Sequence, residues 1–507
     1  MYKPKKSGQY YSFNLEKEAG LIIMNVSNHR FRDITKGLIY TTVLFLFFAF
    51  DQALGQERQT EVTIKSEQFH INGNPTYEGQ KWITSDGEEY PIEGLLMNAR
   101  LIQGTFDDVN SKTRGQWAYP DTREWDPDRN TQEFVDAMAS WQKHGLLGIA
   151  VNLQGGCPYG YCGEQRWDNS AFVPDGSLRE DYMNRLERIL DRADELGMVA
   201  ILGYFYFGQD ENLQDEQAVI HAVENATEWI LKKGYRNVIV EINNECNIRY
   251  DHPILQCDRV HELIEQAKNI EHNGHSLYVS TSLGGGSVPP PNIVGASDYV
   301  LLHGNGVENP ERIVEMIREV REMGVYSPMP IVFNEDDQPW RVDEQGWGEE
   351  GNNFVASVKN YASWGYFDFR RPQERDEFNE GYQSVPVNWQ ISSERKRNFF
   401  DLLARITDSP GTPRVHINFD QKVGKGNIDI EEEKYSDISI DKVELIINNK
   451  VITTVEAPFD FSLDEFGYEL PAGEHWVRAR ITYKNGQRKV IVESPYYKNP
   501  WWPYGGW

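Results

Sequence analysis

Positive charge is scarce in this chain. Its 507 residues include 51 lysines and arginines against 78 aspartates and glutamates, which gives a net charge of −27 at pH 7. Nucleic acids and anionic membranes attract proteins through basic surface, so this composition disfavours both as partners. A carbohydrate ligand is compatible with it, even an anionic one, because a single cleft can be locally basic.

Cysteine is also scarce, and the four cysteines are Cys157, Cys162, Cys246 and Cys257. Their spacing contains no C-x-x-C pair, which argues against a structural zinc site. We expect neither a metal ion nor an organic cofactor. In an exported protein the simplest of the three connectivities pairs neighbours in sequence, Cys157 with Cys162 and Cys246 with Cys257.

The apolar stretch near the start, residues 37–50, is shorter than the ~20 residues that a membrane-spanning helix needs. It follows Arg30, Arg32 and Lys36 and leads into Ala53-Leu54-Gly55, a pattern typical of signal-peptide cleavage. We therefore predict that residues 1–55 are a signal peptide and that the mature protein is secreted or periplasmic. The alternative is a membrane anchor, which we do not expect in the mature form.

A glycine-rich phosphate turn is missing after the first predicted strand, which disfavours a doubly wound nucleotide-binding sheet. Strand-like runs instead alternate with amphipathic helix patterns, as in repeated βα units. The predicted strands are Leu95–Ala99, Leu146–Val151, Met198–Tyr204, Val238–Ile242, Leu277–Thr281, Tyr299–Leu302, Pro330–Phe333 and Tyr366–Phe369. We predict an α/β fold, a (β/α)8 TIM barrel over residues 56–410 that begins with a small hairpin.

The pattern changes at the Pro/Gly-containing stretch Ser409–Arg414. Alternating and β-branched runs follow, with turns such as Asn485-Gly486, and predict an all-β immunoglobulin-like sandwich over residues 411–507. An aromatic tail, Trp501–Trp507, ends the chain. Such a domain either binds glycan or packs on the barrel; we favour packing, because a fold alone confers no function.

Two predicted strands end in polar groups that include a glutamate. Val238–Ile242 runs into Asn243, Asn244 and Glu245, and Pro330–Phe333 runs into Asn334 and Glu335. The carboxyl ends of parallel strands are where catalytic residues collect in this fold class. The sequence therefore predicts two carboxylates that face one cleft.

Paired carboxylates suit the cleavage of a glycosidic bond, which needs a proton donor and a second carboxylate. We expect Glu245 to have a raised pKa and to act as acid and then base. Glu335 would attack as the nucleophile, kept ionised by Arg100 at the end of the first strand. Asn244 would bind the sugar 2-hydroxyl.

Further substrate contacts are predicted at other strand ends and loops. His303, followed by Asn305, ends the sixth strand and is placed to orient Glu335. Asn152 and Tyr204 end the second and third strands. Trp117 and Trp340 lie in long loops on the carboxyl-terminal side, where aromatic rings stack on sugars unless they only pack under the loop.

The run Glu241-Ile242-Asn243-Asn244-Glu245 resembles the E-x-x-N-E motif on strand four of clan A glycoside hydrolases, retaining (β/α)8 enzymes such as cellulases and mannanases. The resemblance implies that Glu245 is the acid/base and that Glu335, at the end of strand seven, is the nucleophile. It spans Leu95 to about Thr407. The sequence departs from the clan at Cys246, where many members have proline, and at Asn334 and Asp336 beside Glu335.

The function we predict is hydrolysis of β-glycosidic bonds in a poly- or oligosaccharide by a retaining double displacement. Two alternatives stay open. Glu335, Asp336 and Asp337 form a carboxylate cluster of the kind that binds Ca²⁺ or Mg²⁺, which would make the protein a metal-dependent carbohydrate-active enzyme. A barrel that binds glycan without turnover is the other.

Overall fold

The structure is a computed structural model. It describes residues 58–119, 122–158, 164–336, 351–368, 381–412, 414–420, 423–431, 440–447, 450–469, 477–483 and 489–491. The predicted signal peptide, Cys162, Trp340, Asp337 and the aromatic tail lie outside the described residues.

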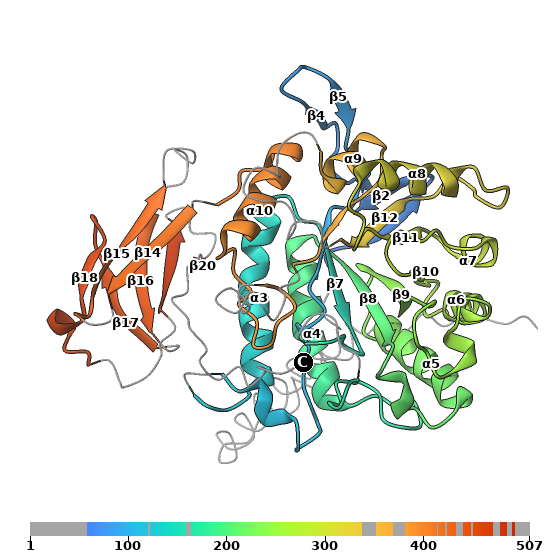
Figure 1. Cartoon of the computed structure of the whole chain (residues 1–507), viewed down its shortest axis with the longest axis horizontal. Coiled ribbons are helices and arrows are strands. Elements are labelled where there is room, and N and C mark those ends of the chain that lie inside the picture. Colours follow the sequence, from blue (N-terminus) through green and yellow to red (C-terminus); the bar gives the residue numbers. More distant parts are fainter. Residues whose placement is uncertain are drawn as a thin grey trace, which may run out of the picture. The chain divides into compact units, whose positions relative to one another are not determined.

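Parallel strands form the centre of the fold (Figure 1). They are β6 (Asn98–Arg100), β7 (Gly148–Asn152), β8 (Val199–Tyr206), β9 (Val238–Asn244), β10 (Tyr278–Ser280), β11 (Val300–His303), β12 (Ile331–Glu335) and β13 (Gly365–Tyr366). Six of them pair in the order β10-β9-β8-β7-β6-β13, and β11 pairs with β12. Parallel bridges between Val332 and Ser363 and between Asp336 and Tyr366 join β12 to the β13 side. This is the α/β TIM barrel that the alternating pattern predicted.

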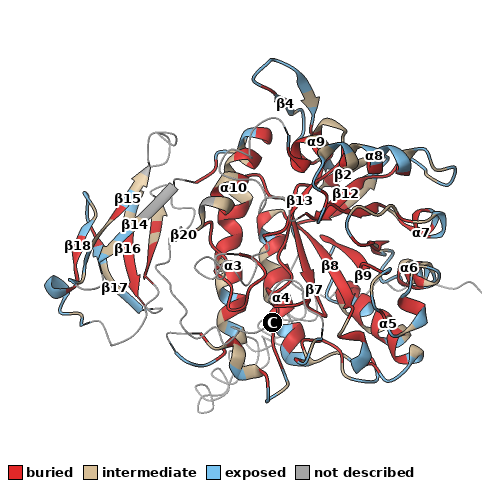
Figure 2. Ribbon diagram, viewed as in Figure 1, coloured by how far each residue is buried: buried red, intermediate tan, exposed pale blue. Residues whose placement is uncertain are grey.

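Helices surround these strands, and most of them have a buried face and an exposed face (Figure 2). They are α3 (Pro127–Lys143), α4 (Glu180–Leu196), α5 (Glu216–Lys232), α6 (Val260–Asn269), α7 (Pro291–Ala296), α8 (Pro310–Arg321), α9 (Asn353–Lys359) and α10 (Glu394–Ile406). Their ends follow local chemistry. Asp126 caps α3 by accepting a hydrogen bond from the Arg129 amide, and Gly197 ends α4 in the left-handed conformation that glycine adopts without strain.

The barrel interior contains an apolar layer that packs separately from the strand–helix interface. Its members are Leu96, Ala150, Val199, Ile201, Ile239, Tyr299, Leu301 and Val332. Neighbouring residues of the same strands, such as Ile149 and Ala200, belong to the cluster that includes the helices, as the alternation of side chains along a strand requires. Val62 and Phe69 of an N-terminal sheet also belong to the interior layer.

The remaining N-terminal elements are antiparallel. They comprise the sheet of β1 (Val62–Lys65), β2 (Gln68–Ile71) and β3 (Asn74–Pro75), and the hairpin of β4 (Lys81–Ile83) and β5 (Glu89–Pro91). Short 3-10 helices occur at η1 (Arg114–Trp117), η2 (Asp210–Asn212) and η3 (Pro253–Leu255).

In the C-terminal region, the described elements are β-strands and one 3-10 helix, η6 (Leu463–Phe466). One antiparallel sheet contains β14 (Arg414–Asp420), β15 (Lys425–Glu431) and β18 (Asp460–Ser462). The other contains β17 (Lys450–Val455), β16 (Ile440–Ile447), β19 (Val477–Tyr483) and β20 (Lys489–Ile491). A core that includes Ile428, Leu445 and Val477 joins strands of both sheets.

Candidate active site

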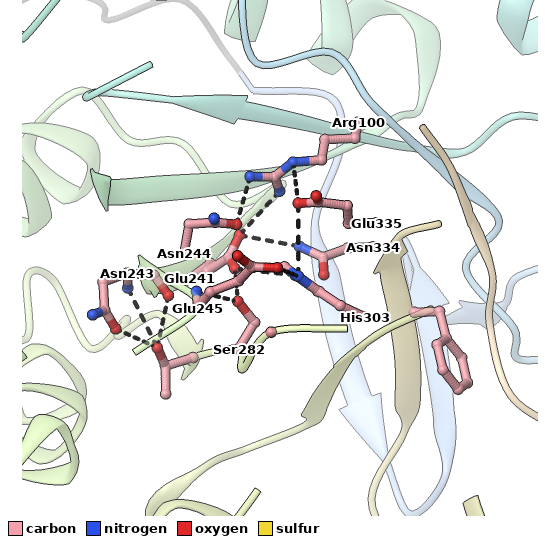
Figure 3. Close-up of polar contacts among 12 residues, drawn as sticks. Arg100, Glu241, Asn243, Asn244, Glu245, Ser282, His303, Asn334 and Glu335 are labelled. Atoms are coloured by element: carbon pink, nitrogen blue, oxygen red, sulfur yellow. Dashed lines mark hydrogen bonds and ion pairs between the residues drawn. The ribbon is translucent and has the colours of Figure 1, made fainter. Parts of the chain in front are cut away.

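A group of buried charged side chains lies at the carboxyl ends of the barrel strands (Figure 3). Arg100 comes from β6, Glu241 and Asn244 from β9, His303 from β11, and Asn334 and Glu335 from β12; Glu245 follows β9 directly. The pairing of β11 with β12 shifts register between Leu302 and His303, so that His303 pairs with Glu335. Such an irregularity re-aims side chains at a strand end.

Glu335 is held by Arg100. The Arg100 Nε lies 2.7 Å from Glu335 Oε2, and both side chains are almost fully buried. The same guanidinium donates through Nη2 to Asn244 Oδ1 at 2.6 Å. Asn305, just after β11, donates to Glu335 Oε1 at 3.2 Å. Arg100 thereby fixes a carboxylate and an amide from two different strands.

Glu245 sits on a strained backbone with φ at +55°, which non-glycine residues rarely adopt. Its amide donates to Ser282 Oγ at 3.0 Å, and its Oε1 lies 3.0 Å from His303 Nδ1 and 3.3 Å from Asn305 Nδ2. The predicted disulfide between Cys246 and Cys257 is present and ties down the loop that follows. Glu245 is therefore positioned from both its backbone and its side chain.

A third carboxylate, Glu241, is fully buried in the same group. Its Oε1 accepts a hydrogen bond from Ser282 Oγ at 2.5 Å, and its Oε2 accepts one from Asn334 Nδ2 at 3.0 Å. Arg100 Nη1 and His303 Nε2 lie 3.7 and 3.8 Å from it, which are ion-pair distances. Glu241 thus pairs with the same two cations that contact Glu335 and Glu245.

Glu245, His303 and Glu335 bring one ligand atom each within 4.8 Å of one another. This spacing suits a metal ion, but the charges favour a proton. Burial lowers the pKa of His303, yet Glu335, Glu241 and Glu245 outweigh burial and raise it to about 10. At neutral pH the ring is then an imidazolium, with an N–H on both of its nitrogens.

The carboxylate cluster considered as a metal site is divided in the structure. Glu335 faces Arg100, whereas Asp336 Oδ2 accepts a hydrogen bond from Trp364 Nε1 at 3.0 Å. Trp364 stacks on Phe354 of α9, so Asp336 belongs to the strand–helix interface. Asp337 lies outside the described residues. Glu335 and Asp336 accordingly do not form one ligand set.

The two glutamates of the pair differ in pKa, in the order opposite to our expectation. Burial raises the pKa of Glu335 to about 7, helped by Glu245 and Glu241 and opposed by Arg100 and His303. Burial also acts to raise the pKa of Glu245, but His303 and Arg100 outweigh it, so the pKa of Glu245 is lowered. Two carboxylates this close share one proton near neutral pH, and in the ligand-free protein that proton favours Glu335.

Of the predicted substrate residues, Arg100, Asn244 and His303 belong to this group. Asn152 is fully buried at the end of β7 and packs over Gly203 of β8. Tyr204 faces away from the glutamates, because its hydroxyl lies 3.0 Å from Thr227 Oγ1 of α5. Trp340 lies outside the described residues.

Trp117 is not a sugar platform in this structure. Its side chain is fully buried, its Nε1 donates to Asp108 at 2.8 Å, and its ring packs edge-on against Phe106 and Trp167. Because the whole side chain is buried, it packs under the loop instead of facing a ligand.

Several members of the site were not predicted. Glu241 carried a detectable signal, because a carboxylate inside the apolar run Val238–Ile242 has to be paired when the strand is buried. Tyr206, at the end of β8, is buried close enough to Glu335 and Glu245 that, with burial, they raise its pKa well above the usual value. Ser282 had no sequence signal.

Comparisons with known proteins give structural neighbours only: no family model matches the chain, and no curated protein does. A glycoside hydrolase family 5 enzyme from Prevotella bryantii B14 is 11% identical, covers 61% of this chain and 95% of its own, and has a TM-score of 0.37. An endo-beta-1,4-mannanase from Thermotoga petrophila is 12% identical, with coverages of 81% and 98% and a TM-score of 0.35.

A glycoside hydrolase family 5 mannosidase from Rhizomucor miehei is 13% identical, covers 70% of this chain and 99% of its own, and has a TM-score of 0.38. By these comparisons the chain is similar to glycoside hydrolases of family 5 and to a mannanase, at identities of 11 to 13%.

None of the helices in the described part of the chain has the length and apolarity needed to cross a bilayer.

Proposed function

We propose that the protein is a secreted glycoside hydrolase that cleaves β-glycosidic bonds of a poly- or oligosaccharide with retention of configuration. One observation carries this proposal. A carboxylate oxygen of Glu245 and one of Glu335 lie within 4.8 Å of each other at the carboxyl end of a barrel. Retaining enzymes hold their carboxyl groups about 5–5.5 Å apart, and inverting enzymes need roughly 6.5–9.5 Å to admit a water molecule. Secretion rests on the predicted signal peptide.

In the first step Glu335 attacks the anomeric carbon while the bond to the leaving oxygen breaks and Glu245 gives that oxygen its proton. In the second step Glu245 takes a proton from water, whose oxygen displaces Glu335 from the sugar. Arg100, at 2.7 Å, supports the role of Glu335 because it stabilises the carboxylate that leaves in the second step.

The pair must place its proton on Glu245 before the first step. In the ligand-free protein the proton favours Glu335, so sugar binding has to move it across the pair. Asn305 Nδ2 lies 3.3 Å from Glu245 and 3.2 Å from Glu335, so the two carboxylates already share a hydrogen-bond donor. The pKa order favours one competing assignment, with Glu335 as acid and Glu245 as nucleophile.

Asn244 has a free donor for the sugar. Its Oδ1 accepts from Arg100, and its Nδ2 is buried without a hydrogen-bond partner among the described residues. An unpaired buried amide is costly, so a ligand oxygen would stabilise it. We assign this donor to the 2-hydroxyl of the bound sugar, whose hydrogen bond strengthens as positive charge develops on the ring.

For the C-terminal domain we propose an immunoglobulin-like sandwich that packs on the barrel. Its two antiparallel sheets support the fold, and the ion pair between Arg478 of β19 and Glu133 of α3, at 3.3 Å, supports the packing role.

A screen of the purified protein against plant and algal polysaccharides tests the activity. Release of reducing ends is expected on at least one β-linked polymer, and proton NMR of the first product should show the β-anomer before mutarotation. The α-anomer would contradict retention. Binding without any turnover, across the panel, would identify a non-catalytic glycan-binding barrel instead.

A further inference from the structure

We propose that Glu241 is the fixed counter-ion of the site, a positioning residue whose negative charge holds His303 as an imidazolium and also favours the retention of one proton on the Glu245–Glu335 pair. The inference deepens the proposed function, and it rests on that function only for the consequence in turnover. Its basis is the set of contacts that converge on one buried carboxylate.

Glu241 is bound on both oxygens, by Ser282 at 2.5 Å on Oε1 and by Asn334 at 3.0 Å on Oε2. Both contacts come from groups that can donate, and a carboxylate that accepts on both oxygens is stabilised in its ionised form. Burial acts to raise the pKa of Glu241, but His303, Arg100 and Ser282 outweigh burial and lower it. The residue is fully buried, so its charge depends on these partners instead of on hydration.

His303 lies between carboxylates on both sides of its ring. Nδ1 is 3.0 Å from Glu245 Oε1 and 3.6 Å from Glu335 Oε2, and Nε2 is 3.8 Å from Glu241 Oε1. A neutral imidazole would turn a lone pair toward one of these oxygens, whereas an imidazolium presents an N–H to each. Glu241 supplies the negative charge on the Nε2 side.

The charges of the whole cluster set the position of the shared proton. The groups that face Glu241 are Arg100 from β6, Ser282 after β10, His303 from β11, and Asn334 and Glu335 from β12, with Glu245 after β9. Burial raises the pKa of Tyr206, Tyr250 and Tyr299, which also sense this charge, so they stay neutral. Two cations then face three carboxylates, and one further proton brings the group to neutrality.

Glu241 reaches the reaction only through its neighbours. It pairs with Arg100 and His303, and these two contact Glu335 and Glu245. Removing its charge, while keeping its shape, should make His303 easier to deprotonate and should release the shared proton at lower pH. The pKa of His303 and the pKa of the shared proton should therefore both fall, and the two shifts can be measured separately.

The test is histidine-selective ¹⁵N NMR of the full chain, with the signal of His303 assigned by its loss in His303→Gln. In the wild type one imidazolium should persist above pH 8. In Glu241→Gln the His303 titration midpoint should fall by about one pH unit or more, as expected for the loss of a neighbouring buried charge. Glu228→Gln, at an exposed ion pair on α5, is the matched control and should leave the midpoint in place.

The readout needs no turnover, so it is separate from the proposed function. If the polysaccharide screen fails and the His303 midpoint still moves, the hydrolase assignment is wrong and the counter-ion role stands. Where turnover is found, the alkaline limb of kcat/KM should shift to lower pH in Glu241→Gln and stay in place in Glu241→Asp.

Two results would overturn the counter-ion role. The first is that no histidine of the wild-type protein stays protonated above pH 8. This measurement does not depend on the folding of any variant. The other is a folded Glu241→Gln whose His303 midpoint lies within ~0.2 pH units of the wild type, less than any close charge would produce.

Discussion

The barrel interior contains two layers of opposite chemistry. The apolar layer around Leu301 and Ile239 and the charged layer around Glu241 and Arg100 are both buried, with exposed fractions of 0 to 6%. Burying an apolar side chain stabilises the fold by roughly 25 cal/mol per Å². Burying charges costs free energy that pairing only partly offsets. The apolar layer therefore carries stability, and the charged layer is kept for its chemistry.

The largest expected effect is on turnover, from the charged layer. Glu335→Ala and Glu245→Ala should each lower kcat by roughly three orders of magnitude or more, because the paired carboxylates act as a unit. The measurement is initial rate on the polymer identified by the screen, with Glu335→Gln as the isosteric comparison. Either alanine variant keeping more than a tenth of the wild-type rate would argue strongly against the pair.

The apolar layer should show the reverse behaviour. Leu301→Ala removes a fully buried side chain and should lower the free energy of unfolding by about 2–5 kcal/mol, measured by urea denaturation. The rate per folded molecule should stay within about twofold of wild type. Ile83→Ala, at a position 61% exposed on β4, is the control and should change stability little. If Leu301→Ala lost rate but kept its stability, the claim that the apolar layer serves stability and not chemistry would be wrong.

Two tyrosines on β8 test which side chains belong to the charged layer. Tyr206 lies near Glu335 and Glu245, whereas the Tyr204 hydroxyl contacts Thr227. Tyr206→Phe should lower kcat/KM about tenfold, the equivalent of one lost hydrogen bond or polar contact. Tyr204→Phe should cost about 1 kcal/mol of stability and leave the rate unchanged. The reverse pattern would mean that Tyr204, as first expected, is the substrate residue.

The charged layer should also make the stability of the protein depend on pH. The pKa of His303 is raised to about 10, so its stabilising contribution is complete below its usual value of 6.5 and is lost as the pH rises through 10. The pKa of Glu335 is raised to about 7, so the folded state also binds a proton more tightly than the unfolded state between pH 4.5 and 7.

Both shifts have the same sign, and the free energy of unfolding should fall as the pH rises from 5 to 10. Urea titrations at several pH values measure it. In Glu335→Gln the fall between pH 4.5 and 7 should shrink, and the fall at higher pH should begin earlier, because the charge of Glu335 also raises the pKa of His303. Stability that increases over the alkaline range would contradict the imidazolium.

The strands and their glutamates were predictable because buried parallel strands are apolar throughout and stop where polar residues begin, as at Ile242 and Phe333. The exact ends were less so. Strand β8 was predicted to end at Tyr204 but continues to Tyr206. The residue at the true end of the strand is therefore Tyr206, which lies near the glutamates, whereas Tyr204 faces helix α5.

Long-range contacts explain the other errors. Trp117 packs against Trp167, fifty residues further along the chain. The sequence around Trp117 does not predict that contact. The pKa order of Glu245 and Glu335 depends on where His303, Arg100 and Glu241 come together in space. The motif identified the two carboxylates, but their protonation is a property of the whole cluster.

Covalent trapping tests the central claim most directly. A 2-deoxy-2-fluoro glycoside of the sugar found by the screen should inactivate the enzyme, and peptide mass spectrometry should place one added glycosyl group on Glu335. A label on Glu245 would reverse the two roles. Turnover without any trapped glutamate would contradict a retaining pair formed by these two residues.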